Sequence, residues 1–594
     1  MIALRWLTFV AVVPLIVAAA PALAAHSTAD TALGPLEGFI KSLFDTVSAT
    51  FTSIGSLFTV TTYITPANGG GKRVKVTGAR WPGGYNSFLG IPYAEAPAGT
   101  KRFDPPQPKV YTADSLSALA FGPACIQPAS LAAGLSGQSE DCLSLNILTP
   151  SAVAGTSARL PVLVWLHGGS FITGTGSYYT VFQAAALSYA KSVGRPVVLV
   201  TLNYRLGVWG FGLGKEMHAA GAANAGLLDQ RLALQWIRDH IAAFGGDPAR
   251  VTAYGQSAGA GSIALHLLDE RSEGLLAGGI MQSGAQDGEP VPRTEDYQAP
   301  YDRLCELAGC NGTASLECLR ALPADALNKA QTALGEEPDY KFGLGSQIWR
   351  PSVDGAVIPD SPFRLLRAGN MANIPFITGT NRDDGTLFVD SGVQTQAEIP
   401  GMIDKLYPRP LGARLWDTIF SAYPNNASLG CPFDTGSDTF GKAVAYKQAA
   451  GIMNDVAFLA PKRNHLRCAN EAGVQGTWSY LFEGPTPVVP KYLGLMHALD
   501  LPYVFGIVSP WLFVAGWTAK DRTMSQQMMQ YWLNFAYNQD PNGDGLPSWP
   551  RHAYPANKNS LLFLPDQVGV IQDDFREERV AIFNDPANAA ELYL

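Results

Sequence analysis

The sequence predicts an α/β fold built on one large, mostly parallel sheet that is flanked by helices. Two observations lead to this prediction. Short runs that are apolar at every position recur along the chain, and longer segments with helical spacing lie between them. Strands buried on both faces of a parallel sheet produce such continuous apolar runs, and the intervening helices cover the two faces. With 594 residues, 47% of them hydrophobic, the chain is long enough for a core of that size.

The expected strands are spread through most of the chain. The runs in question are residues 161–166, 196–201, 251–254, 278–281 and 374–377. Between the second and the third run, residues 227–244 have helical spacing, which stops at Gly245-Gly246. No internal repeat or linker interrupts residues 72–594, so this part of the chain is predicted to form one domain.

The first 24 residues have the pattern of a secretory signal peptide. Arg5 supplies the positive charge, residues 7–20 are apolar, and small residues that suit cleavage follow. A membrane anchor is the alternative, but the apolar run is shorter than the ~20 residues that a span needs. No later segment is apolar enough to cross a bilayer, so the mature chain is predicted to be secreted, without stable insertion into a membrane.

Residues 25–71 are interpreted as an N-terminal extension that precedes the main domain. From Leu36 to Phe58, apolar residues recur at intervals of three or four, as on one face of a helix. The opposite face carries mostly Ser and Thr, so a helix at a membrane surface is the second choice. Packing on the main domain, or a role as a propeptide or spacer, is favoured.

Charge and cysteine content limit the environment and the partners of the chain. The formal net charge is −8 and no basic patch stands out, which argues against nucleic acid as the main partner. Seven cysteines in an exported protein predict disulfides and leave at least one thiol unpaired. Asn311 and Asn426 begin tripeptides that permit N-glycosylation.

The most informative motif is Gly255-Gln256-Ser257-Ala258-Gly259. It follows the expected strand at 251–254 and precedes a stretch of small residues at 260–265 that can continue as a helix. A G-x-S-x-G motif at a sharp turn between strand and helix exposes its serine as a nucleophile. The flanking glycines permit the tight turn and keep bulk away from the hydroxyl. The pattern is weak alone, so its meaning depends on a base, an acid and oxyanion donors elsewhere.

A serine hydroxyl becomes a nucleophile only when a base takes its proton, and that base needs a partner that orients it. Three histidines lie well downstream of Ser257. His497 is favoured because it lies in a compact loop between Gly494 and a proline-bounded apolar run. His465 lies in a basic, helix-like stretch and is expected at the surface, and His552 is expected in an exposed loop.

The acid and the oxyanion donors are expected after two other strands. Asp383 and Asp384 both follow the run at 374–377, and spacing alone does not choose between them. The loop His167-Gly168-Gly169-Ser170-Phe171 follows the run at 161–166 and matches the glycine-rich oxyanion loop of lipases and esterases. Its backbone N–H groups, with that of Ala258, would stabilise a developing negative charge.

Further segments of the chain are specific in combination. They are FLGIPYA at 88–94, SEDCLSLN at 139–146, FGGDP at 244–248, DPN at 540–542 and WP at 549–550. With the motifs above, they resemble the type B carboxylesterases and lipases, the cholinesterase-like family of α/β-hydrolases that includes secreted fungal lipases. The likeness covers nearly all of residues 72–594.

The resemblance implies a role for each candidate residue. The acid falls on Asp384, where the family usually has Glu, and the base falls on His497. The oxyanion N–H groups fall on Gly169, Ser170 and Ala258. Neither a metal nor a cofactor is implied.

The resemblance also implies disulfides between Cys125 and Cys142 and between Cys310 and Cys318. The remaining cysteines can form at most one further pair; they are Cys305, Cys431 and Cys468. Gln256 stands where cholinesterases typically carry Glu, so a buried negative charge beside the nucleophile is missing. Residues 540–545 mimic the start of a calcium loop, but Arg551 stands where its bidentate Glu belongs, which indicates a turn.

The predicted function is that of a secreted carboxylic-ester hydrolase with an acyl-enzyme intermediate. A true lipase or sterol esterase acting on long-chain lipid esters is the alternative, followed by amide cleavage and by a non-catalytic adhesion or binding protein. The segment between Cys125 and Cys142 has only 16 residues and no Trp. This length is too short for a broad amphipathic lid, and the aromatic that would hold a quaternary ammonium is absent. Soluble short- to medium-chain or aryl esters are therefore the predicted substrates, with little interfacial activation and no preference for choline.

Overall fold

The computed structural model describes residues 58–592 with short gaps at 66–72, 82, 129–136, 287, 289, 343–344, 347, 488 and 509–515. The predicted signal peptide lies outside the described residues, as does the predicted amphipathic helix up to residue 57. Within the described part of the chain, no helix combines the length and the apolar composition that crossing a bilayer requires.

A large mixed sheet organises the described chain, with thirteen strands in the order β1-β2-β3-β5-β7-β6-β8-β9-β12-β13-β14-β15 and β4 paired to β2. All pairs from β7 through β14 are parallel, whereas the pairs along β1-β2-β3-β5-β7 and the final β14–β15 pair are antiparallel. The short strand β4 runs parallel to β2. The strand bounds are β1 Thr59–Ile64, β2 Val74–Trp81, β3 Tyr85–Pro92, β4 Ser115–Ser117, β5 Ser144–Pro150, β6 Leu160–Leu166, β7 Val198–Leu202, β8 Gly246–Gln256, β9 Gly278–Gln282, β12 Phe376–Asn381, β13 Thr477–Phe482, β14 Asn559–Phe563 and β15 Gly569–Gln572. A separate hairpin joins β10 Lys341–Phe342 to β11 Gly345–Ser346.

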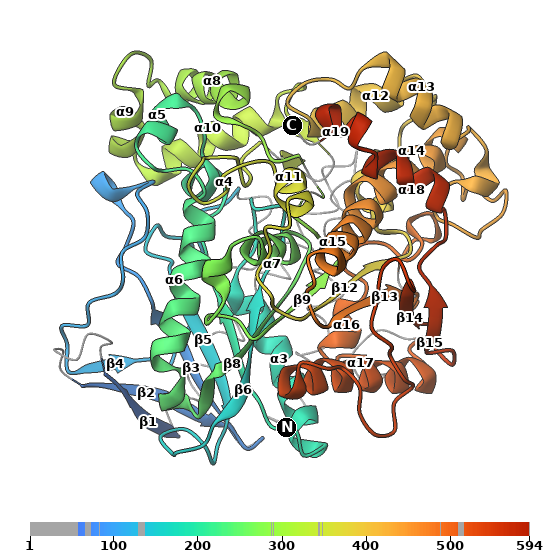
Figure 1. Ribbon diagram of the computed structural model, residues 1–594. Helices are drawn as coiled ribbons and strands as arrows, with labels where there is room; N and C mark the ends of the chain where they lie inside the picture. Colours follow the sequence, from blue (N-terminus) through green and yellow to red (C-terminus); the bar gives the residue numbers. More distant parts are fainter. Residues whose placement is uncertain are drawn as a thin grey trace.

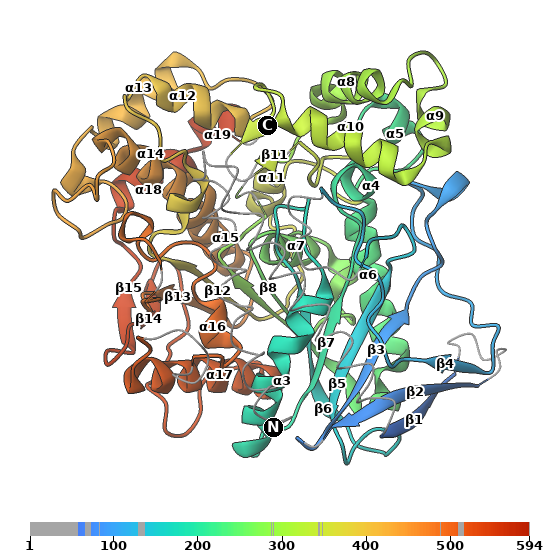
Figure 2. The same cartoon turned by 180° about the vertical axis from the view of Figure 1, so that it is seen from behind.

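Helices cover both faces of the sheet and form a cap above its carboxyl edge (Figure 1). On one face lie α3 Gly176–Ser192, α16 Leu501–Val504 and α17 Ala519–Asn538; on the other lie α6 Ala225–His240, α7 Ala258–Leu267 and α15 Ala460–Glu471. Two groups of helices stand side by side in the cap, and the view from behind shows the same separation (Figure 2). The first group contains α5 Lys215–Ala219, α8 Gln298–Ala308, α9 Ser315–Ala321 and α10 Ala324–Glu336, and the second contains α12 Glu398–Ile403, α13 Ala413–Ala422, α14 Val444–Asn454, α18 Glu577–Asn584 and α19 Pro586–Leu592. The short helix α11 Pro362–Arg367 lies between the groups, and α4 Gly207–Phe211 lies below the first group in Figure 1.

Successive side chains of a central strand point to opposite faces of the sheet, which explains why the predicted strand segments are apolar at every position. Val164 and Trp165 are adjacent in β6 and fully buried, but they belong to different cores on opposite faces of the sheet. Trp165 meets the ring of Phe505 edge-on at 5.1 Å, on the α17 side. Both faces therefore demand apolar side chains, as a covered parallel sheet requires.

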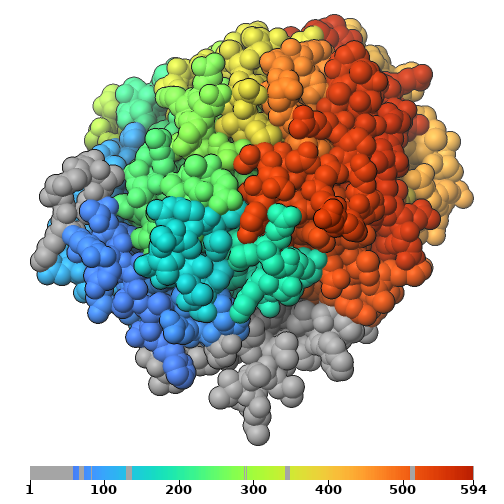
Figure 3. Space-filling model, turned by 60° about the horizontal axis from the view of Figure 1, so that its bottom comes forward, coloured from blue at the N-terminus to red at the C-terminus, as the bar shows by residue number. Residues whose placement is uncertain are grey.

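The structure confirms the five predicted strands and the predicted helix. The five apolar runs correspond to β6, β7, β8, β9 and β12, and the predicted helix at 227–244 is α6 followed by a 3₁₀ turn at Ile241–Phe244. Strand β1 lies upstream of residue 72, where the sequence places the start of the main domain, and pairs with β2 from Thr59 to Ile64. On the face turned forward in Figure 3, the N-terminal strands and the C-terminal part of the chain occupy opposite sides.

Two disulfides join neighbouring segments, Cys125 to Cys142 and Cys310 to Cys318. The other three cysteines are buried as thiols: Cys305, Cys431 and Cys468. Asn311 and Asn426 are both exposed. The Asn426 side chain accepts a hydrogen bond from the N–H of Ser428 at 3.0 Å.

Candidate active site

Ser257 lies at the turn between β8 and α7, in a backbone conformation that few residues adopt. Its φ is 59° and its ψ is −127°, in the positive-φ region that usually signals strain at a functional site. Its N–H donates to the carbonyl of Gln282 at 2.9 Å. A Cβ on Gly259 would lie 2.0 Å from the carbonyl oxygen of Leu166, and one on Gly255 would lie 2.7 Å from it. Glycine is therefore required on both sides of this turn, as the sequence motif predicts.

The loop after β6 brings backbone N–H groups to the same pocket. Gly169, Ser170 and Phe171 have φ values of 115°, 51° and 61°. A Cβ on Gly169 would lie 2.2 Å from the carbonyl oxygen of Thr173, so only glycine fits there. Across the pocket, the N–H of Ala258 is the first of α7, where the helix itself provides no acceptor and its dipole favours negative charge. Ser170 and Ala258 both line the pocket that contains Ser257.

His167, the first residue of that loop, is buried beneath it and contacts its backbone. Its ring is fully buried and stacks on Tyr204 with 4.3 Å between the centroids. Its Nδ1 lies 2.9 Å from the carbonyl of Gly168, and the Tyr204 hydroxyl donates to the His167 carbonyl at 2.7 Å. Burial lowers the pKa of His167 to about 4, so the ring is neutral at physiological pH and acts as a support for the loop.

Asp384 and His497 form a buried pair. The two side chains are 0% and 5% exposed, and Oδ1 of Asp384 lies 2.8 Å from Nδ1 of His497. The other carboxylate oxygen accepts the backbone N–H of Asn381 at 2.8 Å. An ionised carboxylate can only accept, so Nδ1 carries the proton and Nε2 presents its lone pair. The aspartate side chain is thus long enough to reach the imidazole.

Asp383 points elsewhere, so the structure separates the two neighbouring aspartates that spacing left open. Its Oδ2 accepts the N–H of Leu495 at 2.9 Å, and its Oδ1 accepts the N–H of Phe433 at 2.9 Å and the thiol of Cys431 at 3.2 Å. Burial raises the pKa of Asp383, and these donors oppose that shift. Asp383 fastens the loop that carries His497, a role for which the sequence offers no signal beyond its position next to Asp384.

Two phenylalanines that the sequence did not single out flank the imidazole. The ring centroids of Phe388 and Phe458 lie 5.0 and 4.9 Å from that of His497. Phe458 belongs to a π-helical turn, Asp455–Leu459, between α14 and α15, and such turns recur at functional sites. The flanking rings shield the Asp384–His497 pair from water.

The Nε2 atom of His497 is bound to the side chain of Gln256, whose amide nitrogen lies 2.9 Å away. Within the described residues, the hydroxyl of Ser257 makes no hydrogen bond to His497. Gln256 is 4% exposed and lies at the end of β8, directly before the turn. The structure therefore brings Asp384 and His497 together and places Ser257 beside them, but not in direct contact with the imidazole.

The expectation that His465 and His552 lie at the surface is wrong. His465 is 1% exposed; it binds the side chain of Gln286 and meets the ring of Phe376 edge-on at 4.8 Å. His552 is 6% exposed and binds Asn470 at 2.9 Å. The basic stretch around His465 is buried because Asp573 binds both Lys462 and Arg463, at 2.8 and 2.7 Å. Neither histidine contacts the Asp384–His497 pair.

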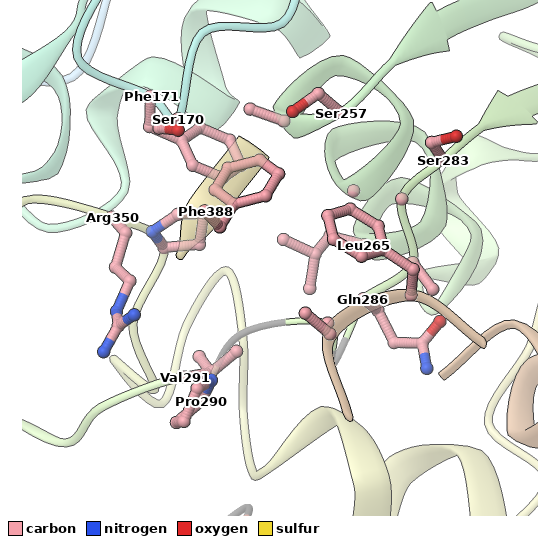
Figure 4. A pocket seen from close by; sticks show the side chains of 18 residues that line it. Ser170, Phe171, Ser257, Leu265, Ser283, Gln286, Pro290, Val291, Arg350 and Phe388 are labelled. Carbon is pink, nitrogen blue, oxygen red and sulfur yellow. The ribbon is translucent and has the colours of Figure 1, made fainter. Parts of the chain in front are cut away.

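A largely apolar pocket of about 70 Å³ opens in front of Ser257. Figure 4 shows Phe171 and Phe388 on one side of it and Leu265, Pro290 and Val291 below the serine. The guanidinium of Arg350 points away from Ser257 in this view. Such a surface accommodates an apolar group next to a polar reacting centre. In the described part of the chain, no three His, Cys, Asp or Glu side chains gather in a way that could hold a metal ion.

A serine on a sharp strand-to-helix turn, a glycine-rich loop beside it and a buried Asp–His pair downstream define the class of the α/β-hydrolases. The family model described as "Carboxylesterase family" matches residues 62–583. The chain belongs to this family, the type B carboxylesterases and lipases, and is a hydrolase of carboxylic esters.

Known proteins from fungi and bacteria are similar over most of their length. The chain is 34% identical over 530 residues to "Secreted lipase 1" of Botryotinia fuckeliana (strain B05.10), covering 82% of this chain and 88% of the relative. It is 33% identical over 509 residues to the para-nitrobenzyl esterase of Bacillus subtilis (strain 168), covering 84% and 95%. The crystal structure of Aspergillus niger EstA, 24% identical, matches with a TM-score of 0.74 over 88% of this chain and 98% of that one. This last likeness supports the fold.

Proposed function

We propose that the chain is a secreted serine esterase in which Ser257, His497 and Asp384 form the catalytic triad. The single observation that carries the proposal is the buried Asp384–His497 pair, 2.8 Å apart, beside a serine held at φ 59°. His497 takes the proton of Ser257 as its Oγ attacks the ester carbonyl. The alcohol leaves with that proton, and water then releases the acid from the acyl-enzyme by the same route.

The oxyanion of each tetrahedral intermediate is stabilised by the N–H groups of Gly169, Ser170 and Ala258. The positive φ values of the loop support this proposal, because they turn successive N–H groups away from regular pairing. Asp384 holds Nδ1 protonated and stabilises the imidazolium that forms. The catalytic domain is proposed to comprise residues 72–594 together with β1, Thr59–Ile64, which pairs with β2 in the main sheet.

The proposed substrates are soluble short- to medium-chain or aryl esters. Two observations support this class: the short segment between Cys125 and Cys142, and a pocket of about 70 Å³ with mostly apolar walls. A true lipase is the second candidate, because one of the similar proteins is named a secreted lipase. Secretion of this chain is supported by its two disulfides, by that relative and by the signal-like first 24 residues.

Covalent labelling tests the nucleophile. A fluorophosphonate should add one phosphonyl group, on Ser257, and Ser257→Ala should abolish ester hydrolysis while leaving the thermal unfolding curve close to wild type. Label on another residue, or turnover near wild type in Ser257→Ala, would falsify the triad.

A panel of p-nitrophenyl esters of rising chain length tests the substrate class. The rate should peak at short to medium chains and show no jump when a triglyceride passes its solubility limit. A sharp jump there favours the lipase. The same assay on a protein lacking residues 25–57 shows whether the N-terminal extension contributes to surface sensing.

A further inference from the structure

The hydrogen bond between Gln256 and His497 concerns the atom that must accept the serine proton. Nδ1 of His497 is committed to Asp384 at 2.8 Å, so Nε2 is the basic nitrogen of the ring. That nitrogen has one lone pair in the ring plane. The amide nitrogen of Gln256 lies 2.9 Å from it and can only donate, so the lone pair is already occupied.

The Gln256 side chain lies in a confined space. Its side chain is buried at the end of β8. Its Oε1 lies toward the oxyanion loop, since a Cβ on Gly168 would be 3.1 Å from that oxygen. The amide therefore fills the space between the oxyanion loop and the imidazole, with its NH₂ group directed at Nε2.

We propose that Gln256 is a positioning residue that holds the base of the resting enzyme away from Ser257. The proposal rests on the triad proposed above. In the resting state the N–H of Gln256 occupies Nε2, and Ser257 has no bond to the imidazole. Reaction at Ser257 requires the amide to give up this bond, because Nε2 becomes an N–H donor once it takes the serine proton. Two donors would then face each other at 2.9 Å.

A half-turn of the amide resolves this conflict. The terminal torsion of a glutamine side chain is broad and roughly two-fold, so Oε1 can replace the nitrogen with little movement of other groups. The oxygen then accepts the new Nε2–H. Glutamine can follow both protonation states of the imidazole in this way, whereas a carboxylate at the same place can only accept.

The rate at which Ser257 reacts in the absence of substrate tests the proposal. With diisopropyl fluorophosphate, the Oγ–P bond forms, the P–F bond breaks, fluoride leaves and the serine proton passes to Nε2. Gln256→Met keeps the size of the side chain and removes the donor. Because one neutral hydrogen bond no longer competes for the lone pair, we expect inactivation about fivefold faster than in the wild type.

Gln183→Met is the matched control. Gln183 is also fully buried, and its amide donates at 2.6 Å to the hydroxyl of Tyr254, which lies two positions before Gln256 in β8 and on the same face of the sheet. This variant should lose comparable stability and inactivate at the wild-type rate. Equal or slower inactivation of Gln256→Met, relative to the wild type, overturns the proposal.

A spectroscopic signal separates a freed nitrogen from a general loosening of the site. In protein labelled with ¹⁵N-histidine, the Nε2 resonance of His497, assigned by its loss in His497→Gln, should move toward the position of a free imine nitrogen in Gln256→Met. It should not move in Gln183→Met. An unmoved resonance in Gln256→Met counts against the proposal.

A second variant and the site of labelling distinguish a failure to fold, a wrong triad and a wrong role for Gln256. If Gln256→Met does not fold, Gln256→Ala removes the same donor and carries the same expectations. If no variant is labelled on Ser257, the triad itself fails. If Ser257 is labelled at one common rate in wild type and Gln256→Met, only the role of Gln256 fails.

Discussion

Replacing Asp383 by Asn should lower the stability of the fold much more than the rate of catalysis, unlike the same change at its neighbour Asp384. The Asp383 carboxylate accepts the N–H groups of Leu495 and Phe433, each at 2.9 Å, and is 2% exposed. Asparagine keeps one acceptor oxygen and turns an NH₂ group toward the other donor. A lost hydrogen bond to a buried charge costs about 1.5–3 kcal/mol, and the orphaned N–H costs about 1–3 kcal/mol. The neutral amide is cheaper to bury, which offsets part of this loss.

We therefore expect Asp383→Asn to lower the free energy of unfolding by about 3 kcal/mol. Its kcat should fall by less than ~10²-fold, the scale of a base displaced by about 1 Å. Asp384→Asn should instead lower kcat by ~10⁴-fold, by analogy with the triad aspartate of a serine protease. Urea unfolding followed by tryptophan fluorescence and steady-state kinetics of a p-nitrophenyl ester measure both quantities. A ~10⁴-fold loss in Asp383→Asn with an unchanged unfolding curve would show that the acid is Asp383.

The remaining predictions concern His497 and three buried groups outside the active site. His497→Gln should lower kcat as much as Ser257→Ala does. His465→Gln and His552→Gln should leave kcat within a few-fold of the wild type and lower the unfolding midpoint. A large loss of kcat in His465→Gln or His552→Gln would contradict the assignment of His497 as the base. Burial works to raise the pKa of Asp573, but Lys462 and Arg463 outweigh it and hold that pKa well below its ordinary value. This carboxylate therefore stabilises the fold above about pH 4, and the contribution is lost as the pH falls further. Asp573→Asn should flatten that acid dependence in unfolding curves measured from pH 6 to pH 3, and an unchanged slope would refute the role of the ion pair.

The sequence was sufficient to predict the features that depend on local chemistry. The continuous apolar runs identified the central strands, because both faces of the sheet are covered. The glycines around Ser257 predicted the sharp turn that carries this serine, because a Cβ on Gly255 or Gly259 would collide with the Leu166 carbonyl oxygen. These patterns are written in consecutive residues, so one sequence can show them.

The parts that the sequence missed depend on contacts between distant residues. His465 lies among Lys and Arg residues, which favoured the surface, but the carboxylate that compensates them is more than a hundred positions away at Asp573. The role of Asp383 requires knowing that the loop at Leu495 returns to the acid turn. The aromatic flank of His497 depends on a π-helical turn that inserts Phe458 beside the imidazole. None of these pairings leaves a trace in local spacing.

Hydrogen bonds join the turn at residues 381–386 to the loop at residues 493–497, and they limit how far these two segments can move relative to each other. Asn381, Asp383 and Thr386 bind the backbone of Met496, Leu495 and Leu493 at 2.8, 2.9 and 2.7 Å. These hydrogen bonds, with the one between Asp384 and His497, tie the two segments together, while Ser257 is carried by the separate turn between β8 and α7. A displacement of the β8–α7 turn relative to these tied segments would therefore change the Ser257–His497 separation more than the Asp384–His497 distance. Of the two separations within the proposed triad, the one between Ser257 and His497 is therefore the less constrained, and Gln256 links β8 to His497 at this place.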